Sequence, residues 1–591
     1  MTPYQPPLRD IRFALHALAG LEAVAALPAF AGLNPALADA VLEEGGRLAA
    51  EVLAPLNRPG DAQGARLDGE AVITPPGFAD AYRRFVEGGW NGLSAPVEFG
   101  GQGLPELLGA ALYEMWNAAN MAFTLCPMLT AAAVAALQAH GSPAQQALYL
   151  PRLVSGEWTG TMVLTEPQAG SDLAAVRARA VPEGDHYRLY GQKIFITWGD
   201  HDMAENIVHM VLARTPDAPP GVKGISLFLV PKYLPDGGGP GRRNDVRCLA
   251  LEHKLGIHAS PTCVLAFGDR DGAVGWLVGE KNQGLAHMFT MMNEARLKVG
   301  SEGLGLAQGA YQQALAYARQ RVQGQRPGAA EGQRVTLIHH PDVRRMLLAM
   351  KCQTEAMRAL GYVAAMHLDL ARHHPDAAAR RAHRARVELL TPIAKGWCTE
   401  VGFDLTSLGV QVHGGMGYIE EAGVCQYLRD ARITTIYEGT TGIQALDLVR
   451  RKLPADRGAA MAALLADMRA VAKELATADA ELAVIRAALE EGIRHLDDAS
   501  RRLLAAGADA VLAQAVNYLL LAGYVCGGWQ LARAALAARR RLAAGADADF
   551  YRARLVSARF YAEQILPRAG ALAAAVASGA TATLALDEAQ F

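Results

Sequence analysis

Leu164-Thr-Glu-Pro-Gln-Ala-Gly-Ser-Asp-Leu173 leaves a predicted strand and turns through Pro167 and Gly170. Ser171 and Asp172 stand where a side chain can cap the short helical turn that comes next. Such a turn exposes backbone N–H groups, which suit a phosphate or a carbonyl oxygen. Because the same letters also fit an ordinary loop, the surrounding segments decide how this one is interpreted.

The residues around this segment form a β-rich region within a mostly helical chain. Residues 159–280 hold short runs of β-branched and aromatic residues separated by Gly, Asp and Pro, which predict a compact β domain. Helical patterns cover residues 1–158, 281–455 and 456–591. We therefore expect a mainly α protein with a central β domain and an additional C-terminal helical domain, divided at these boundaries.

The composition is that of an ordinary globular enzyme. Of 591 residues, 51% are hydrophobic and 20% are charged, which argues against a disordered or fibrous chain. Lys and Arg number 57 against 59 Asp and Glu, so the molecule as a whole does not attract a nucleic-acid backbone. We expect no nucleic-acid partner.

The cysteines and the first residues predict the compartment. Seven Cys are scattered without CxxC or Cys/His ligand spacing, which favours a reducing environment and no metal site. Asp10 lies among the first basic residues, and His16 and Glu22 interrupt the apolar stretch that follows. We therefore expect no secretory signal and a cytoplasmic protein.

Two long uncharged stretches approach the length of a membrane span, Trp116–Gln138 and Val511–Trp529. Polar residues, Pro and Gly interrupt both of them: Asn117, Asn120 and Pro127 in the first, and Gln514, Asn517, Gly527 and Gly528 in the second. We expect buried helices, with a peripheral membrane contact as the open alternative.

Common nucleotide and nucleophile motifs are missing: GxGxxG after a strand, GxxxxGK[ST], GxSxG and HExxH. A dinucleotide would therefore bind without a Rossmann unit. Gly191-Gln-Lys-Ile-Phe-Ile-Thr-Trp-Gly199 offers another surface, since strand alternation would place Phe195 and Thr197 on one face. An aromatic ring beside a hydroxyl suits a flat heterocycle, although plain strand packing explains the same pattern.

Glu438 is the candidate general base. It follows a β-branched run and precedes Thr441-x-x-Gln444, a capping box that predicts a helix from Ile443 to Lys452. A loop carboxylate beside backbone amides and against apolar Ile436 and Tyr437 can have its pKa raised when a ligand expels water, as a general base requires. A solvated loop glutamate is the alternative interpretation.

Taken in order, these segments resemble the acyl-CoA dehydrogenase family over roughly residues 40–455. The strongest matches are Thr165-Glu-Pro-x-Ala-Gly-Ser-Asp172, Gly191-Gln-Lys-Ile-Phe-Ile-Thr197, Lys254-Leu-Gly-Ile257, Arg429-Asp-Ala-Arg-Ile433 and Ile436-Tyr-Glu-Gly-Thr440. The resemblance implies a helical domain, a β-barrel or sandwich and a four-helix bundle. The N-terminal extension, the Arg321 segment and the extra C-terminal domain resemble a longer bacterial branch, which includes 3-methylmercaptopropionyl-CoA dehydrogenases alongside enzymes for ordinary fatty acyl-CoAs.

The resemblance implies FAD as the cofactor and assigns residues to it. It surrounds the isoalloxazine ring with Leu164, Thr165, Phe195 and Thr197, of which Thr197 lies near N5. It places Ser171 at the pyrophosphate and Thr440 against the flavin. A neighbouring subunit would bind the ADP portion through Arg321, Gln411 and Gly415, so a homodimer is expected.

The same resemblance implies the substrate and the reaction. It places at an acyl-CoA thioester the residues Ser171, Arg296, Tyr437 and Gly439. Glu438 would remove the α-proton while the β-hydride passes to flavin N5, which gives a trans-2-enoyl-CoA. Hydrogen bonds from the Glu438 N–H and a flavin ribityl hydroxyl would stabilise charge on the thioester oxygen. An electron-transferring flavoprotein is the expected electron acceptor.

Several positions depart from the family pattern. Phe195 stands where many relatives have Trp, Gln323-Gly324 replaces a Thr-Phe pair and Gly442 replaces a Gln, which leaves the adenine contacts open. Some relatives carry the base on a helix directly before an Arg, but Ala295 precedes Arg296 here and Glu294 is one residue further away. Adjacent helix residues point about 100° apart, so the alternative base is disfavoured.

Other functions compete with a dehydrogenase. An acyl-CoA oxidase would pass its electrons to oxygen, and a non-catalytic flavin-fold protein would bind DNA through a basic patch that the balanced charge does not favour. A nitroalkane-type oxidase is disfavoured because its relatives use Asp where Glu438 stands. The length, branching and sulfur content of the acyl group stay open, as does the choice between a dimer and a tetramer.

Overall fold

The computed structural model describes residues 3–236, 239–326, 333–478 and 480–591. Its contacts divide the chain into two compact units. Unit 1 combines residues 1–43, 105–118 and 299–591, and unit 2 combines residues 44–104 and 119–298. Two long helices contribute residues to both units, α6 (Glu106–His140) and α8 (Gly284–Gln320). α6 leaves helical geometry at Asn120, where φ is −163°.

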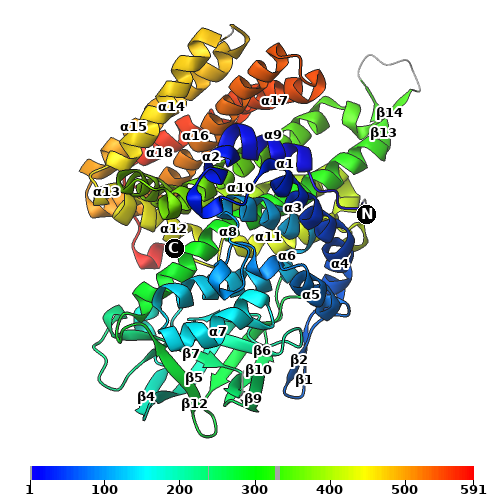
Figure 1. The fold of residues 1–591 in the computed structure, drawn as a ribbon. Coiled ribbons are helices and arrows are strands. Elements are labelled where there is room, and N and C mark those ends of the chain that lie inside the picture. Colours follow the sequence, from blue (N-terminus) through cyan, green and yellow to red (C-terminus); the bar gives the residue numbers. More distant parts are fainter. Residues whose placement is uncertain (1–2, 237–238, 327–332, 479) are drawn as a thin grey trace. The chain divides into compact units, whose positions relative to one another are not determined.

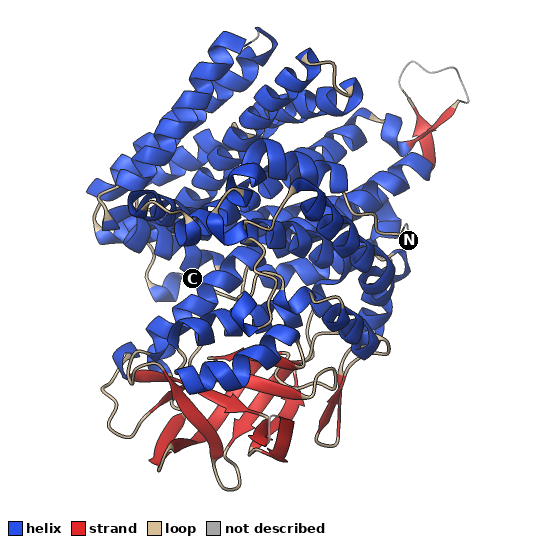
Figure 2. Ribbon diagram, viewed as in Figure 1, coloured by secondary structure: helices blue, strands red, loops and turns tan. Residues whose placement is uncertain are grey.

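Unit 2 contains the β domain that the sequence predicts, and Figure 2 shows its strands gathered together. The main sheet has eight strands: β3 (Trp158–Val163), β4 (Arg179–Glu183), β5 (His186–Thr197), β6 (Asn206–Arg214), β7 (Ile225–Pro231), β10 (Val246–Leu251), β11 (Thr262–Phe267) and β12 (Ala273–Val278). The order is β10-β11-β5-β12-β7-β6-β3, with β4 beside β5 and β6. The pairs along this order are antiparallel except β3 with β6.

Smaller elements complete unit 2. Its shorter helices are α4 (Ala54–Gln63), α5 (Phe78–Glu87) and α7 (Pro143–Ser155), and its two-stranded ladders are β1 (Arg66–Asp68) with β2 (Ala71–Ile73) and β8 (Tyr233–Asp236) with β9 (Gly239–Arg243). α7 begins at a capping box, in which the Ser142 hydroxyl accepts from the Gln145 N–H while the Gln145 side chain accepts from the Ser142 N–H.

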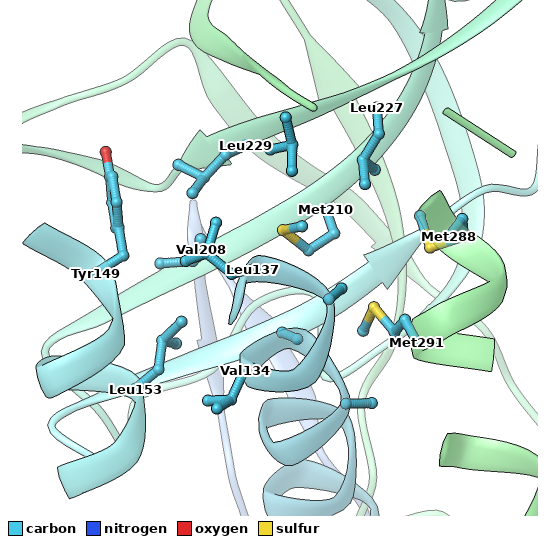
Figure 3. Packing of buried hydrophobic residues seen from close by; sticks show 14 of the residues in the cluster. Val134, Leu137, Tyr149, Leu153, Val208, Met210, Leu227, Leu229, Met288 and Met291 are labelled. Atoms are coloured by element: carbon cyan, nitrogen blue, oxygen red, sulfur yellow. The ribbon is translucent and has the colours of Figure 1, made fainter. Parts of the chain in front are cut away.

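The core of unit 2 lies between the sheet and three helices, as Figure 3 shows. Val134 and Leu137 of α6, Leu153 of α7 and Met291 of α8 meet the buried face of the sheet, which includes Met210. β6 and β7 are buried along nearly their whole length, as expected of strands covered on both faces. This packing is the reason why an apolar, β-branched stretch forms a sheet here.

Unit 1 is built from helices (Figure 1). Besides parts of α6 and α8 it contains α1 (Leu8–Phe13), α2 (Leu21–Ala25), the first part of α3 (Pro35–Leu48), α9 (Pro341–His373), α10 (Ala377–His413), α11 (Val424–Thr434), α12 (Thr441–Asp447), α13 (Leu453–Ala455), α14 (Ala459–Ala478), α15 (Ala483–Ala505), α16 (Ala508–Ala543), α17 (Ala548–Phe560) and α18 (Arg568–Ser578). A small ladder, β13 (Val322–Gln325) with β14 (Arg334–Thr336), projects from these helices in Figure 1.

The C-terminal helices of unit 1 join the bundle through close glycine contacts. Gly523 and Gly527 of α16 face the fully buried ring of Trp397 in α10. A methyl group on Gly523 would come within 2.2 Å of that ring, so only glycine permits this approach. The uncharged stretch that contains these glycines is therefore a packing surface for α10.

The N-terminal residues also belong to unit 1. The guanidinium of Arg554 in α17 pairs with Asp10 of α1 and, at 2.8 Å, with Glu355 of α9. Arg9 lies over the ring of Phe550, 4.0 Å from its centroid. These contacts tie the N-terminal extension to the C-terminal helices, which are far away in the sequence.

Two described helices, α6 and α16, are long and apolar enough to cross a membrane by length and composition alone. The most apolar window of α6 is 89% buried inside the protein and that of α16 is 61% buried. Most of each window is thus covered by other parts of the chain, in agreement with the expected buried helices.

Candidate active site

A buried ion pair holds the Leu164–Asp172 turn against β5. Lys193 is fully buried, and its ammonium donates to Glu166 at 2.8 Å and to the Leu164 carbonyl at 2.9 Å. The Ile194 N–H donates to the Thr165 carbonyl at 2.9 Å. Burial lowers the pKa of Lys193 to about 8, although Glu166 opposes the shift. The structure therefore brings Leu164 and Thr165 beside the end of β5.

The helical turn after this segment forms as expected. The Asp172 carboxylate accepts from the Ala174 N–H at 3.0 Å and caps a single 3₁₀ turn, Leu173–Ala175. Ser171, the neighbour of this cap, is exposed. An exposed hydroxyl beside a turn of backbone N–H groups is suited to a phosphate oxygen.

Phe195 lies in a β-bulge, which interrupts the regular alternation of β5 between Lys193 and Ile196. In the register with β11, Lys193 pairs with Leu265 and Ile196 pairs with Cys263, which leaves one extra residue in β5. Phe195 adopts a positive φ of 59° and is 58% exposed. Lys193 and Ile196, three positions apart, are both buried. Phe195 and Thr197, on either side of Ile196, are more exposed.

These unit 2 residues fit a flat, polar-edged cofactor. An exposed aromatic ring at Phe195, the hydroxyl of Thr197 and the Leu164–Thr165 backbone lie together at one end of β5. A left-handed backbone conformation is costly for a bulky residue and clusters at functional sites. FAD offers both a ring for this aromatic surface and a diphosphate for the capped turn.

The α8 residues expected near the substrate lie in the interior of the protein. Arg296 is 4% exposed and stands over the Phe289 ring at 5.7 Å from the centroid. Ala295 is fully buried and Glu294 is 6% exposed. The position used by the alternative base therefore carries no acid in this chain.

In unit 1, Glu438 lies on the short connection between α11 and α12. Thr440 caps α12, because its hydroxyl accepts from the Ile443 N–H at 3.1 Å. The predicted capping box at Thr441 and Gln444 is wrong: the cap lies one residue earlier, the helix begins at Thr441, and the Thr441 hydroxyl donates to Glu400 at 2.5 Å. α12 is continued by a π-helical turn from Leu448 to Lys452.

The Glu438 connection is a strained turn that a buried lysine holds in place. Glu438 has a φ of 52° and Gly439 a φ of 87°, two left-handed residues in succession. The fully buried ammonium of Lys395 donates to the carbonyls of Thr434 at 2.7 Å and Gly439 at 2.8 Å. The Gln444 amide donates to the Glu438 carbonyl at 3.3 Å. Glu438 itself stays partly exposed, and Thr440, the cap of α12, lies two residues after it.

The sequence interpretation missed Lys395 and Glu302. Glu302 of α8 is fully buried and accepts a 2.5 Å hydrogen bond from the Tyr437 hydroxyl. Both residues interrupt otherwise apolar or small-residue helix stretches, Thr391-Pro-Ile-Ala-Lys-Gly-Trp-Cys398 and Val299-Gly-Ser-Glu-Gly-Leu304. A lone charge in such a stretch was the available signal, since buried charges are rare unless they are paired.

The residues expected to serve a neighbouring subunit are exposed in unit 1. Gln411 lies near the end of α10, and Gly415 lies in the 3₁₀ turn that follows, Gly414–Tyr418. Tyr418 at the end of this turn is 88% exposed. Arg321 is exposed between α8 and β13.

Two departures from the family pattern, Gln323 and Gly324, follow Arg321 closely in the chain, and the third, Gly442, lies in α12. The Gln323 carbonyl accepts from the His340 ring at 2.7 Å, and Gly324 has a φ of 73°. Gly442 lies in the first turn of α12, where an added methyl group would meet only the Thr440 hydroxyl, at 3.6 Å. The Gly324 backbone conformation explains why a glycine replaces a larger residue there.

Comparison with known proteins identifies the family. The acyl-CoA dehydrogenase N-terminal domain matches residues 39–157, the middle domain matches 161–270 and the C-terminal domain matches 282–453. An "acetyl-CoA dehydrogenase C-terminal like" family matches residues 464–587. Together these matches cover most of the chain.

Individual relatives agree with these matches. The chain is 49% identical to a 3-methylmercaptopropionyl-CoA dehydrogenase of Ruegeria pomeroyi over 95% of this chain and 96% of that protein. It is 36% identical to a butyryl-CoA dehydrogenase of Syntrophomonas wolfei over 95% of each. A solved acyl-CoA dehydrogenase of Bacillus anthracis, complexed with FAD, shares the fold with a TM-score of 0.74 at 21% identity and covers 92% of this chain and 88% of that one.

The expected fold of a mainly helical protein with a central β domain and an extra C-terminal helical domain is confirmed. The chain belongs to the acyl-CoA dehydrogenase family of FAD-dependent oxidoreductases.

Proposed function

We propose that the protein oxidises an acyl-CoA thioester to the trans-2-enoyl-CoA, with Glu438 as the base that removes the α-proton. The observation that carries this proposal is the Glu438 turn. The backbone of Glu438 adopts a left-handed conformation, and Lys395 and Gln444 hold the neighbouring carbonyls. Its side chain stays partly exposed, two residues before Thr440, which caps α12. Strain of this kind persists where the surrounding structure enforces it, as at functional sites.

The remaining site residues have supporting roles in this proposal. FAD supplies the acceptor for the β-hydride when it is bound. Phe195 and Thr197 offer a surface for its ring, and Ser171 a hydroxyl for its phosphates. Tyr437 and Gly439 lie on either side of the base, where they would orient the thioester. Holding the reacting groups in this geometry accounts for several kcal/mol of rate enhancement in enzymes generally.

We propose a short acyl-CoA as the substrate, with 3-methylmercaptopropionyl-CoA as the first candidate. The support is the 49% identity to an enzyme of that name over nearly the whole chain, against 36% for a butyryl-CoA dehydrogenase. An anaerobic titration that follows flavin bleaching with a panel of acyl-CoAs tests this choice. Equal bleaching by butyryl-CoA and 3-methylmercaptopropionyl-CoA would reject a preference for the sulfur-containing substrate and support only short acyl-CoAs as a class.

The partner, location and domain boundaries are part of the same proposal. We propose an electron-transferring flavoprotein as the acceptor, a cytoplasmic homodimer, and domains at residues 1–158, 159–280, 281–455 and 456–591. Arg321, Gln411 and Gly415 are exposed, as residues that complete a partner's flavin site must be. Hydrogen peroxide formation that outpaces reduction of the flavoprotein would favour an oxidase instead.

The decisive experiment replaces the base. Glu438→Gln keeps the size of the side chain but removes its proton affinity, so it should retain yellow flavin and lose on the order of 100-fold or more of its turnover. Rapid mixing with acyl-CoA measures flavin reduction directly. Near-normal reduction in this variant would overturn the assignment of Glu438.

A further inference from the structure

A second carboxyl group lies behind the Glu438 turn. Glu302 of α8 is fully buried, and its Oε2 accepts a 2.5 Å hydrogen bond from the hydroxyl of Tyr437. Tyr437 directly precedes Glu438 in the chain. The side chain of Tyr437 therefore connects the base-bearing turn to α8, at a residue 135 positions away in the sequence.

Lys395 anchors the other side of the same turn. Its ammonium donates to the carbonyl of Gly439, the residue directly after Glu438, and to that of Thr434. The residues before and after Glu438 are thus both fixed by buried polar side chains, from α8 and from α10. A left-handed glutamate is costly unless its neighbours hold it, and these two anchors hold the residues on both sides of Glu438.

We propose that Glu302 is a positioning residue for Glu438, acting through the hydrogen bond that it receives from Tyr437. This inference rests on the proposed role of Glu438 as the base. Glu302 contacts neither flavin nor substrate in this proposal. Glu302 fixes the position of Glu438, and it does so as a neutral carboxylic acid.

The surroundings of Glu302 favour the neutral form. Burial raises the pKa of Glu302 to about 8, while Tyr437 and Lys395 lower it and Glu438 raises it. The pKa of Tyr437 is itself raised, first by burial and then by Glu302, Glu438 and the charge of Asp430 in α11. Oε1 of Glu302 is buried without a hydrogen-bond partner among the described residues. An ionised carboxylate would leave that oxygen uncompensated, whereas a protonated acid does so at lower cost.

Three variants separate the hydrogen bond from the charge. Glu302→Gln keeps an acceptor for Tyr437 without an ionisable group, while Glu302→Leu and Tyr437→Phe remove the hydrogen bond. At neutral pH we expect Glu302→Gln to reduce flavin within about threefold of wild type, and the other two variants to be slower by about tenfold or more, because a small misplacement of a reacting group is costly.

The pH profile adds a readout that a merely structural role would not move. Flavin reduction by wild type, followed from about pH 6 to about pH 10, should show an inflection near pH 8 where Glu302 ionises. Glu302→Gln should lack this inflection. The matched control is Asp369→Asn, which removes another buried acid of raised pKa, one that accepts from the Glu106 and Leu107 N–H groups at the start of α6. Its profile should match wild type.

A measurement without turnover completes the test. The infrared difference between wild type and Glu302→Gln should contain the carbonyl stretch of a protonated carboxyl at neutral pH, and this band should disappear above about pH 9. Absence of the band, or an unchanged pH profile in Glu302→Gln, would overturn the inference. If Glu302→Leu does not fold, these two readouts decide alone.

Failure of the inference can be told apart from failure of the proposed function. If Glu438→Gln still reduces flavin at the wild-type rate, Glu438 is not the base and the function proposal falls. If Glu438→Gln is inactive while Glu302→Leu and Tyr437→Phe equal wild type at every pH, the base stands and only the role of Glu302 is rejected.

Discussion

At the scale of single residues, the site depends on charged side chains that are buried inside the protein. Lys395 and Lys193 are both fully buried ammonium groups, and each donates to backbone carbonyls of a loop that carries proposed site residues. Lys193 holds Leu164, and Lys395 holds Gly439. Hydrogen bonds from a charged donor stabilise more than neutral ones, and losing one partner leaves the other buried without compensation.

Replacing Lys395 tests this anchoring. Lys395→Met keeps the length and apolar stem of the side chain but loses both hydrogen bonds to the Thr434 and Gly439 carbonyls. We expect a destabilisation of about 2–5 kcal/mol, measured by denaturant unfolding, and flavin reduction slower by about tenfold or more. The exposed Lys473→Met of α14 is the matched control. Equal rates in the two variants would contradict the anchoring role.

The pH dependence of stability reports on Glu302. Its pKa is raised from 4.5 to about 8 on folding, so the folded protein keeps a proton that the unfolded chain releases. Stability from this group is complete below about pH 4.5 and is lost as pH rises through about 8, by up to about 1.4 kcal/mol per pH unit. Urea midpoints at several pH values should therefore fall more steeply for wild type than for Glu302→Gln. Parallel curves would contradict the raised pKa.

At the scale of elements, glycines decide how closely α16 approaches α10. Gly523 faces Trp397 so closely that a Cβ atom would overlap the ring, whereas Gly361 in the interior of α9 has open space around its missing side chain. Glycine therefore has opposite effects in two helices of unit 1. In α16 glycine permits the packing, and in α9 it only weakens the helix.

A pair of alanine substitutions separates these two cases. Gly523→Ala should destabilise the protein by about 1–3 kcal/mol, because the added methyl group overpacks the contact with Trp397. Gly361→Ala should stabilise it by about 0.5–1 kcal/mol through helix propensity and a more restricted unfolded chain. Thermal or denaturant unfolding of both variants checks the opposite signs. A shift in the same direction for both would refute the assignment.

At the scale of the whole molecule, the C-terminal helices bind back onto the N-terminal extension. Arg554 joins α17 to Asp10 and Glu355, and Arg9 stacks on Phe550. The additional domain is thus an integrated part of unit 1. We propose that it covers the surface through which shorter members of the family form tetramers.

The oligomeric state follows from that proposal. Light scattering of the purified protein should give the mass of about two chains, because the C-terminal helices occupy one of the surfaces that a tetramer needs. Arg321→Ala should keep this mass and yet bind FAD more weakly, since the arginine would serve the partner's cofactor. A mass near four chains would reject the covering role.

Short sequence motifs were sufficient to predict the family, the β domain and the location of Glu438 on a loop before a helix. Thr165-Glu-Pro-x-Ala-Gly-Ser-Asp172 and Ile436-Tyr-Glu-Gly-Thr440 carry their chemistry in residues that are adjacent in the chain. Turn and strand preferences depend on such neighbours, which is why a single sequence predicts them.

Only the tertiary structure shows which distant residues hold those motifs in place. Glu302 meets Tyr437 across 135 positions, and Lys395 reaches Thr434 and Gly439 across 39 and 44 positions. The bulge at Phe195 depends on how β5 pairs with β11. Burial, register and partner choice are set by residues that are distant in sequence, so a local pattern shows at most an unusual lone charge and not the group with which it pairs.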